Sequence, residues 1–223
     1  GDYPITASGK AAQGNYTVTY NPGTLTITKK SVDVTVVADN KTKTYGEADP
    51  AFTAKVNGTV GEDKINYTLS RAEGEDVGEY AIEVTLGDNP NYEVTKTDAK
   101  LTITPKAVTV TADNKTKTYG EADPAFTAKV NGTVGEDKIN YTLSRAEGED
   151  VGEYAIEVTL GDNPNYEVTK TDAKLTITPK AVTVTADNKS KTYGEADPEL
   201  TAKVDGTING DTVDYTLSRA TGE

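Results

Sequence analysis

The octapeptide KTYGEADP occurs three times in this chain, at residues 43–50, 117–124 and 191–198. Its tyrosines Tyr45, Tyr119 and Tyr193 are evenly spaced, since 119 − 45 and 193 − 119 both give 74. Helical solenoid units have only about 20 to 47 residues, so this period indicates a small domain that is repeated. Length alone, at about 100 to 200 residues per domain, would predict one or two domains. The period favours three small modules.

The boundaries of the repeat can be drawn in two phases. Residues 38–106 and 112–180 are identical, which indicates recent duplication, while the third copy differs in details. Residues 1–30 align with the back half of a unit. The first phase has a back half at 1–30, full repeats at 31–106 and 107–180, and a front half at 181–223. The permuted phase has three units, at 1–77, 78–151 and 152–223.

A lone half-unit would be marginally stable, because exposed strand edges need partners and two or three strands rarely fold alone. We therefore expect residues 1–30 to pack with the residues after them, or the terminal halves to be completed by neighbouring chains.

Each unit has the alternation of apolar and polar residues that is typical of half-buried strands. In the second copy this alternation predicts six strands, near residues 108–111, 126–130, 139–143, 154–160, 166–168 and 175–177. Asn131-Gly132 is typical of a two-residue hairpin, and residues 147–153 and 162–165 have turn chemistry. No stretch supports a helix. The predicted fold class is all-β, a tandem array of small β-sandwich-like modules, Ig-like or β-grasp-like.

The connections between units predict an end-to-end rod. Only Pro105-Lys106 or Pro179-Lys180 separates the last strand of one full unit from the first strand of the next. A proline at such a point interrupts the ladder of hydrogen bonds while leaving little slack. Consecutive units are therefore expected to extend the array instead of folding back.

Composition excludes several classes of function. The 36 acidic residues outnumber the 23 basic ones, which gives a net charge of −13 and disfavours nucleic acid and anionic membrane surfaces as partners. The chain has no Cys, His, Trp or Met, so thiolate and imidazole catalysis and the usual zinc sites are excluded. No run of 18 apolar residues occurs, so we expect no membrane insertion within this sequence.

Several blocks of the sequence carry a resemblance to a known family. VTVTADNKTKTYGEADP, YTLSRAEGEDVGEYAI and NYEVTKTDAKLTITPKA, in this order, resemble the MBG repeat family of the YGX type. Members of that family occur as tandem arrays in large bacterial surface and secreted proteins, many of them adhesin-like. The resemblance implies an extracellular, mostly β module at a bacterial cell surface or in a secreted protein. It implies no enzyme activity.

The repeated motif itself has a structural and a functional interpretation. In the structural one, Gly120 supplies a backbone angle that other residues avoid, Asp123-Pro124 starts a turn and the ring of Tyr119 closes one end of a thin core. In the functional one, Asp113, Glu121 and Asp123 are oxygen ligands for Ca²⁺. We favour the structural interpretation and expect calcium to be at most a modest stabiliser.

Two other groups of residues are candidates for chemistry. Glu147, Glu149, Asp150 and Glu153 lie close in sequence, and a glycosidase needs only two carboxyls at the right separation, but a thin module leaves little room for a pocket. Tyr45, Tyr67 and Tyr92 could stack on a glycan if exposed, although tyrosines in such strands usually belong to the core. We expect no catalytic, cofactor-binding or metal site.

The sequence thus predicts a structural repeat that acts as a rigid spacer in a stalk or fibre. The alternative is a multivalent module with one weak glycan or protein site per repeat, strengthened by avidity. The expected partners are neighbouring repeats of the same chain, with self-association by exchange between repeats and an unidentified host or cell-surface ligand as further alternatives.

Overall fold

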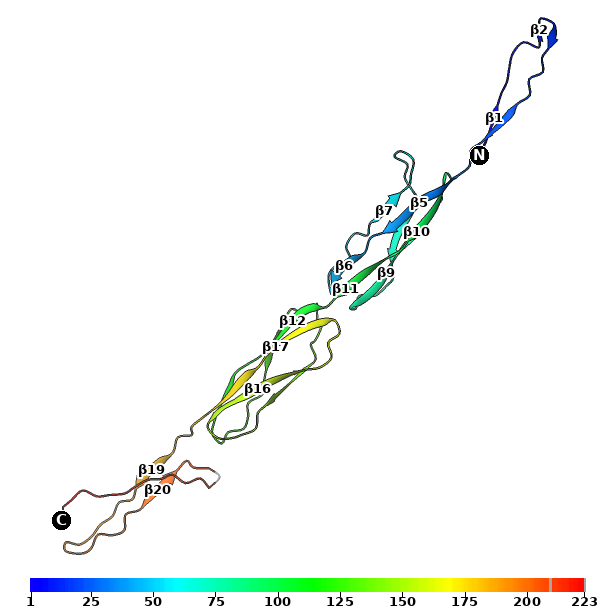
Figure 1. Cartoon of the computed structure of the whole chain (residues 1–223). Helices are drawn as coiled ribbons and strands as arrows, with labels where there is room; N and C mark the ends of the chain where they lie inside the picture. The colour runs from blue at the N-terminus through cyan, green and yellow to red at the C-terminus, as the bar shows by residue number, and fades with distance from the viewer. Residues whose placement is uncertain (209, 223) are drawn as a thin grey trace. The chain divides into compact units, whose positions relative to one another are not determined.

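A computed structural model describes residues 1–208 and 210–222, with the side chains of residues 31–33 left out (Figure 1). The chain divides into two units, Gly1–Lys106 and Ala107–Glu223. Each unit contains one complete module and one terminal segment. The first module is residues 31–106 and the second module is residues 107–180. None of the described residues forms a helix, so none of them provides a helix that could cross a membrane.

The second module consists of two sheets. The three-stranded sheet has the order β14-β12-β17, and the four-stranded sheet has the order β13-β18-β16-β15. The strands are β12 (Lys106–Ala112), β13 (Lys115–Thr118), β14 (Ala128–Asn131), β15 (Tyr141–Arg145), β16 (Gly152–Leu160), β17 (Tyr166–Thr171) and β18 (Ala173–Thr178).

The first module repeats this architecture. Its sheets have the orders β10-β5-β7 and β6-β11-β9-β8. The strands are β5 (Lys30–Ala38), β6 (Lys41–Thr44), β7 (Ala54–Asn57), β8 (Tyr67–Arg71), β9 (Gly78–Leu86), β10 (Tyr92–Thr97) and β11 (Ala99–Thr104). Mixed pairing is a feature of the module, because β5 runs parallel to β10 and β6 runs parallel to β11.

The core of each module lies between its two sheets. In the second module Val110 from the three-stranded sheet and Ile156 and Leu175 from the four-stranded sheet are completely buried and belong to one cluster. The alternation in the sequence explains this, because every second side chain of a strand points to the same face. The predicted all-β class, with small repeated modules, is confirmed.

The two halves of a module interlock. The front half of the second module carries β12 to β15, within residues 106–146, while the back half, residues 152–178, carries β16 to β18. Each of β12, β13 and β15 pairs directly with a back-half strand, and β18 lies between β13 and β16. Neither half can therefore complete its sheets without the other.

Two details of the predicted strand pattern are wrong. The segment Lys115–Thr118 forms β13, a seventh strand that the sequence pattern did not indicate because its alternation is Lys with Thr. Asn131-Gly132 does not close a hairpin: Gly132 has a positive φ of 102°, but β14 pairs with β12 whereas β15 pairs with β16 in the other sheet. The chain thus changes sheets at the position where a two-residue hairpin was expected.

The two terminal segments contain only part of the strands of a complete module. Residues 1–30 contain β1 (Asp2–Ile5) paired with β4 (Gly23–Thr26), and β2 (Ala12–Gln13) paired with β3 (Tyr16–Thr17). All of its described side chains are exposed except the half-buried Val18 and Tyr20. None of its residues belongs to the buried core of the first module, and both the phase of the repeat and the packing of residues 1–30 remain predictions. At the other end, β19 (Thr183–Ala186) pairs with β20 (Ala202–Asp205).

Candidate functional site: a buried ion cluster and a repeat joint

The motif KTYGEADP supplies half of a buried ion cluster in the second module. Lys117 on β13 is only 5% exposed, and its Nζ donates to Asp123 Oδ1 at 2.7 Å and to Glu149. The other oxygen of Asp123 accepts from Arg145 Nε at 2.6 Å, and Arg145 also donates to Glu149. Two cations and two carboxylates therefore form a closed ring of charge-assisted hydrogen bonds, which are stronger than neutral ones.

The loop after β15 wraps around the guanidinium of this cluster. Arg145 Nη1 donates to the carbonyl oxygens of Ala146 and Gly148, at 2.8 and 2.6 Å. Its Cζ lies 5.7 Å from the centroid of the Tyr154 ring, within the range of a cation–π interaction. Gly148 has φ +134°, and a Cβ at this position would lie 2.2 Å from Tyr154 Cε1. The loop therefore needs a glycine here.

The first module contains the same cluster. Lys43 is 5% exposed and donates to Asp49 Oδ1 at 2.7 Å, and Arg71 Nε donates to Asp49 Oδ2 at 2.6 Å, with Glu75 bound by both cations. In the third copy Lys191 and Arg219 both pair with Asp197, at 2.9 and 2.5 Å. The cluster therefore depends on the front half for most of its members.

The charges of the cluster stabilise one another. Hydrogen bonds from Arg145 and then Lys117 lower the pKa of Asp123 below its ordinary value of 3.8. The hydrogen bond from Lys117 lowers the pKa of Glu149, and the hydrogen bonds to Asp123 and Glu149 raise the pKa of Lys117. In the third copy Arg219 lowers the pKa of Asp197 to about 2.

These shifts predict how the stability of the second module depends on pH. The carboxylates have lowered pKa values, so their contribution is complete above the ordinary values of 3.8 and 4.5 and is lost as the pH falls through the lower folded-state values. Lys117 has a raised pKa, so its contribution is complete below 10.5 and is lost as the pH rises through the folded-state value.

We therefore expect the melting temperature to be level between about pH 5 and pH 10 and to fall on both sides. Calorimetry across this range measures it. In an Asp123→Asn variant, the melting temperature of the second module should fall less steeply below about pH 5 than it does in the unmodified chain. Acid limbs of equal slope would assign the acid sensitivity to other carboxylates.

The Tyr-Gly turn of the second module meets the third copy in a joint. The half-buried Tyr119 donates its hydroxyl hydrogen to Asp211 Oδ2 at 2.9 Å. Gly120 has φ +86°, and a Cβ there would lie 2.0 Å from Ile208 Cδ1. The turn is closed locally, because the amide of Thr118 donates to the carboxylate of Glu121 at 2.8 Å. Gly120 thus serves both the positive φ and the close approach of Ile208.

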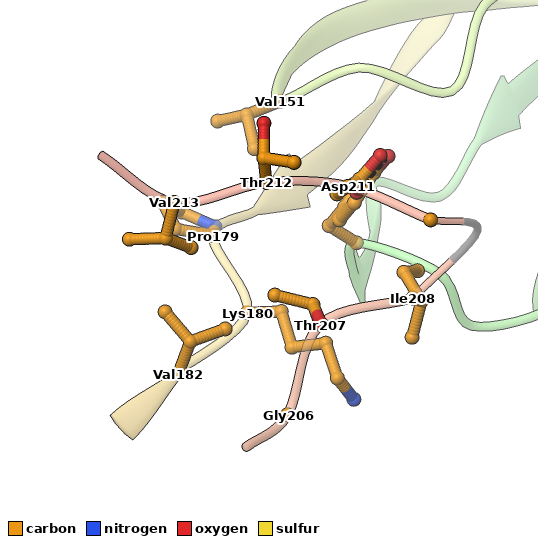
Figure 2. A pocket seen from close by; sticks show the side chains of 12 residues that line it. Val151, Pro179, Lys180, Val182, Gly206, Thr207, Ile208, Asp211, Thr212 and Val213 are labelled. Carbon is orange, nitrogen blue, oxygen red and sulfur yellow. Dashed lines mark hydrogen bonds between the residues drawn. The ribbon is translucent and has the colours of Figure 1, made fainter. Parts of the chain in front are cut away.

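A hollow of about 580 Å³ lies beside this joint. Figure 2 shows its wall, which is formed by the connection between the module and the third copy and by the loop that carries Ile208. Its apolar lining includes Val151, Pro179, Val182, Ile208 and Val213. The hollow is open to solvent, and its lining comes from both the second module and the third copy. It is therefore a surface formed where two repeats meet.

Each of the three proposed calcium ligands accepts a hydrogen bond from a different group of the second module. Asp113 accepts from the Thr127 hydroxyl at 2.6 Å, Glu121 caps the Thr118 amide and Asp123 belongs to the ion cluster. In the described part of the chain no group of three or more Asp, Glu, His or Cys side chains is arranged to hold a metal ion. Calcium as a modest stabiliser remains a prediction.

The acidic loop and the tyrosines also have assigned places. Glu149 belongs to the ion cluster, Glu153 accepts from Lys174 Nζ at 2.6 Å, and the carbonyl of Asp150 accepts from the Tyr154 hydroxyl at 2.9 Å. Tyr45 and Tyr67 pack against the core of the first module, and Tyr92 is buried within it.

Lys117 and Arg145 were not predicted from the sequence as members of a site. The alternation of the strand residues could have indicated them. Arg145 lies on the same face of β15 as Tyr141 and Leu143, and Lys117 occupies the inward position of β13. A charged residue at an inward strand position requires an opposite charge nearby. The acidic residues of KTYGEADP and of the loop after β15 meet this requirement.

The comparisons with known proteins agree with the repeated architecture. No curated protein shows significant similarity to this chain. The pattern of the MBG domain (YGX type) matches residues 34–102, 108–176 and 182–223. The first two matched ranges each contain one set of buried core residues apart from its last member, since Ile103 and Ile177 lie one residue beyond the ends of the matches. The chain belongs to the MBG (YGX-type) domain family and matches that domain three times in tandem, the third match covering only the front half of a repeat.

Proposed function

We propose that this chain is a structural spacer, a run of MBG repeats in the stalk or fibre of an extracellular, adhesin-like bacterial surface protein. The family is consistent with a repeat module of a surface protein, and an all-β repeat is not typical of enzymes. The spacer role rests on one observation in particular, the joint between the second module and the third copy.

The joint restrains the angle between successive repeats. Pro179-Lys180 is a short connection with one residue of fixed φ, and the Tyr119–Asp211 hydrogen bond and the contact of Ile208 with Gly120 lie beside it. A linker of Gly and Ser would leave the two parts free to move as a random coil. A short connection with contacts between the two repeats beside it is what a stiff spacer requires.

The alternative, a multivalent binding module, depends on exposed tyrosines. The most exposed ones are Tyr193 at 86% and Tyr16 at 77%. Both lie in the terminal segments, and their counterparts in complete modules, Tyr119 and Tyr92, pack against or within a core. Tyr193 and Tyr16 are exposed because they do not pack against the core of a complete module, and their exposure does not mark a ligand-binding face. This favours the structural role.

Spin-label distance measurements across the joint test the proposal. The chain has no cysteine, so labels can be attached at Thr142→Cys and Lys203→Cys, two exposed positions on either side of the joint. We expect a narrow distance distribution that broadens at least about two-fold in an Ile208→Ala, Tyr119→Phe double variant, since both contacts at the joint are then weakened.

The matched control is Tyr193→Phe, which changes the equivalent but exposed tyrosine and should leave the distribution narrow. Equal widths in the double variant and the unmodified chain would contradict a restraint by these contacts. A distribution that is already broad without substitution would contradict the spacer role. The end-to-end rod itself remains a prediction, and small-angle scattering would contradict it with a radius of gyration near the roughly 17 Å of a compact chain of this length.

A further inference from the structure

The two complete modules have interchangeable halves. Residues 38–106 and 112–180 are identical, so the back halves of the two modules, β9 to β11 and β16 to β18, are the same. The front half of the first module, β5 to β8, can therefore make the same contacts with either of them. Exchange between neighbours is a characteristic failure of repeat proteins. The side chains do not distinguish the two pairings, so the connections of the chain have to.

The chain enters a module at one end and leaves it at the other. In the first module β5 runs parallel to β10, and β6, which follows β5, runs parallel to β11, which follows β10. Figure 1 shows β5 and β10 towards one end of this module and β6 and β11 towards the other. Asp98, between β10 and β11, accepts from the amide of Val84, and the chain then runs along β9 as far as the pair Ile103 and Gly78. Entry and exit are therefore separated by the length of two successive strands.

This separation is large compared with the connection between the modules. Val94 lies beside Val34 near the entry, and Thr104 ends β11 at the exit. The chain advances by 104 − 94 = 10 residues between Val94 and Thr104, which is about 33 Å in strands. The second module's counterpart of Val34 is Val108, and the 108 − 104 = 4 steps from Thr104 to it extend by at most about 14 Å. The connection is thus too short to lead from the exit of a module back to its entry.

We propose that the short Pro105-Lys106 connection prevents the identical modules from exchanging their halves. A complete exchange has to build two modules, one from the outer halves and one from the inner halves. The inner halves are residues 78–104 and 108–145, and a module made from them would have to be closed by the connection between Thr104 and Val108. Exchange therefore leaves the inner halves unpaired, and each module folds from its own two halves. Duplication can then add identical repeats without adding a second complete way to pair them.

A disulfide can report the exchange, because the chain has no cysteine. Thr68 lies opposite Thr85 in β8 and β9, and Thr142 lies opposite Thr159 in β15 and β16, all at exposed positions. Opposite residues of antiparallel strands have Cα atoms about 4.5–5.5 Å apart, within the range of a disulfide. In a Thr68→Cys, Thr159→Cys variant, the two cysteines lie opposite each other only in the exchanged pairing.

The test is to lengthen the connection in this variant. About 30 Gly and Ser residues, inserted between Pro105 and Lys106, have a mean span of about 30 Å. After refolding from urea at micromolar concentration under mildly oxidising conditions, we expect only a trace of intrachain disulfide in the unextended variant. The extended variant should form at least about ten times as much, because both pairings can then be completed. Non-reducing electrophoresis separates intrachain from interchain disulfides, and mass spectrometry of the joined peptides identifies them.

The matched control carries the same insertion between Pro179 and Lys180. It leaves the connection between the first two modules short, so it should form no more of the 68–159 disulfide than the unextended variant. A Thr68→Cys, Thr85→Cys variant of the extended chain should still form its disulfide in most molecules, since the correct pairing stays available.

Equal amounts of the 68–159 disulfide with and without the extension would overturn the proposal. A disulfide between two chains of the unextended variant would also overturn it, because identical halves would then exchange in spite of the short connection. None of these outcomes depends on the stiffness of the joint, so the spacer role is tested separately.

Discussion

Lys117→Met is expected to split the thermal unfolding of this chain into two transitions, with the second module melting more than about 10 °C below the first. Lys117→Met leaves the two carboxylates, Asp123 and Glu149, with Arg145 still bound to both but with one positive charge fewer, and removing one partner of a buried ion pair is destabilising. The side chains of Asp123 and Glu149 are 31% and 60% exposed, so solvent screens part of their unbalanced negative charge. The expected decrease in melting temperature is therefore smaller than for a completely buried ion pair. One kcal/mol shifts the melting temperature of a domain of this size by about 4–8 °C.

The chain contains its own control for this experiment. Residues 38–106 and 112–180 are identical, so the first module should melt as before, and Lys43→Met should produce the same split with the roles of the modules exchanged. Lys129→Met makes the same chemical change at an exposed position of β14 and should move the melting temperature by less than about 2 °C. A single, unshifted transition in Lys117→Met would show that the cluster contributes nothing to stability.

Gly148→Ala is expected to destabilise the second module by at least about 2 kcal/mol. The backbone angle there, φ +134°, strains any residue with a Cβ, which costs on the order of 1–3 kcal/mol. The added methyl group would also displace the Tyr154 ring from the guanidinium of Arg145, since the Cβ would lie 2.2 Å from Cε1. Urea denaturation followed by tyrosine fluorescence measures the loss.

Gly135→Ala is the matched control for this substitution. Gly135 also has a positive φ, +54°, but nothing lies within 4 Å of the position of its Cβ. This angle is in the left-handed region that non-glycine residues adopt at modest cost, so the variant should lose less than about 1 kcal/mol. Equal losses in both variants would mean that the contact with Tyr154 has no role.

The strands with apolar alternation could be predicted from the sequence, and those without it could not. β16 was clear because Tyr154, Ile156, Val158 and Leu160 alternate with polar residues. β13 has only Lys and Thr, and its inward residue is a lysine whose burial depends on Asp123, six residues further along, and on Glu149, 32 residues away. Local patterns do not contain partners at such separations.

The point at which the chain changes from one sheet to the other also could not be predicted from short sequence motifs. Asn-Gly is the preferred pair of a two-residue hairpin, and the positive φ of Gly132 was correctly indicated. The partner of a strand, however, is selected by packing over the whole module, and β14 finds β12 while β15 finds β16. The role of Tyr119 in a joint depends on Asp211, 92 residues away, which a repeat of 74 residues places in the next copy.

The position of β18 between β13 and β16 determines how a module responds to a pulling force. The chain enters the second module at β12 and leaves it at β18 (Figure 1), so tension on the ends draws β18 along its own axis. Its parallel ladder to β13 and its antiparallel ladder to β16 are then loaded in shear together, and no bond at an edge can open first. Resistance of this kind appears as a slow rate of forced unfolding, which depends on the unfolding barrier and not on equilibrium stability. A thin module can therefore hold under load for longer than its small core would indicate.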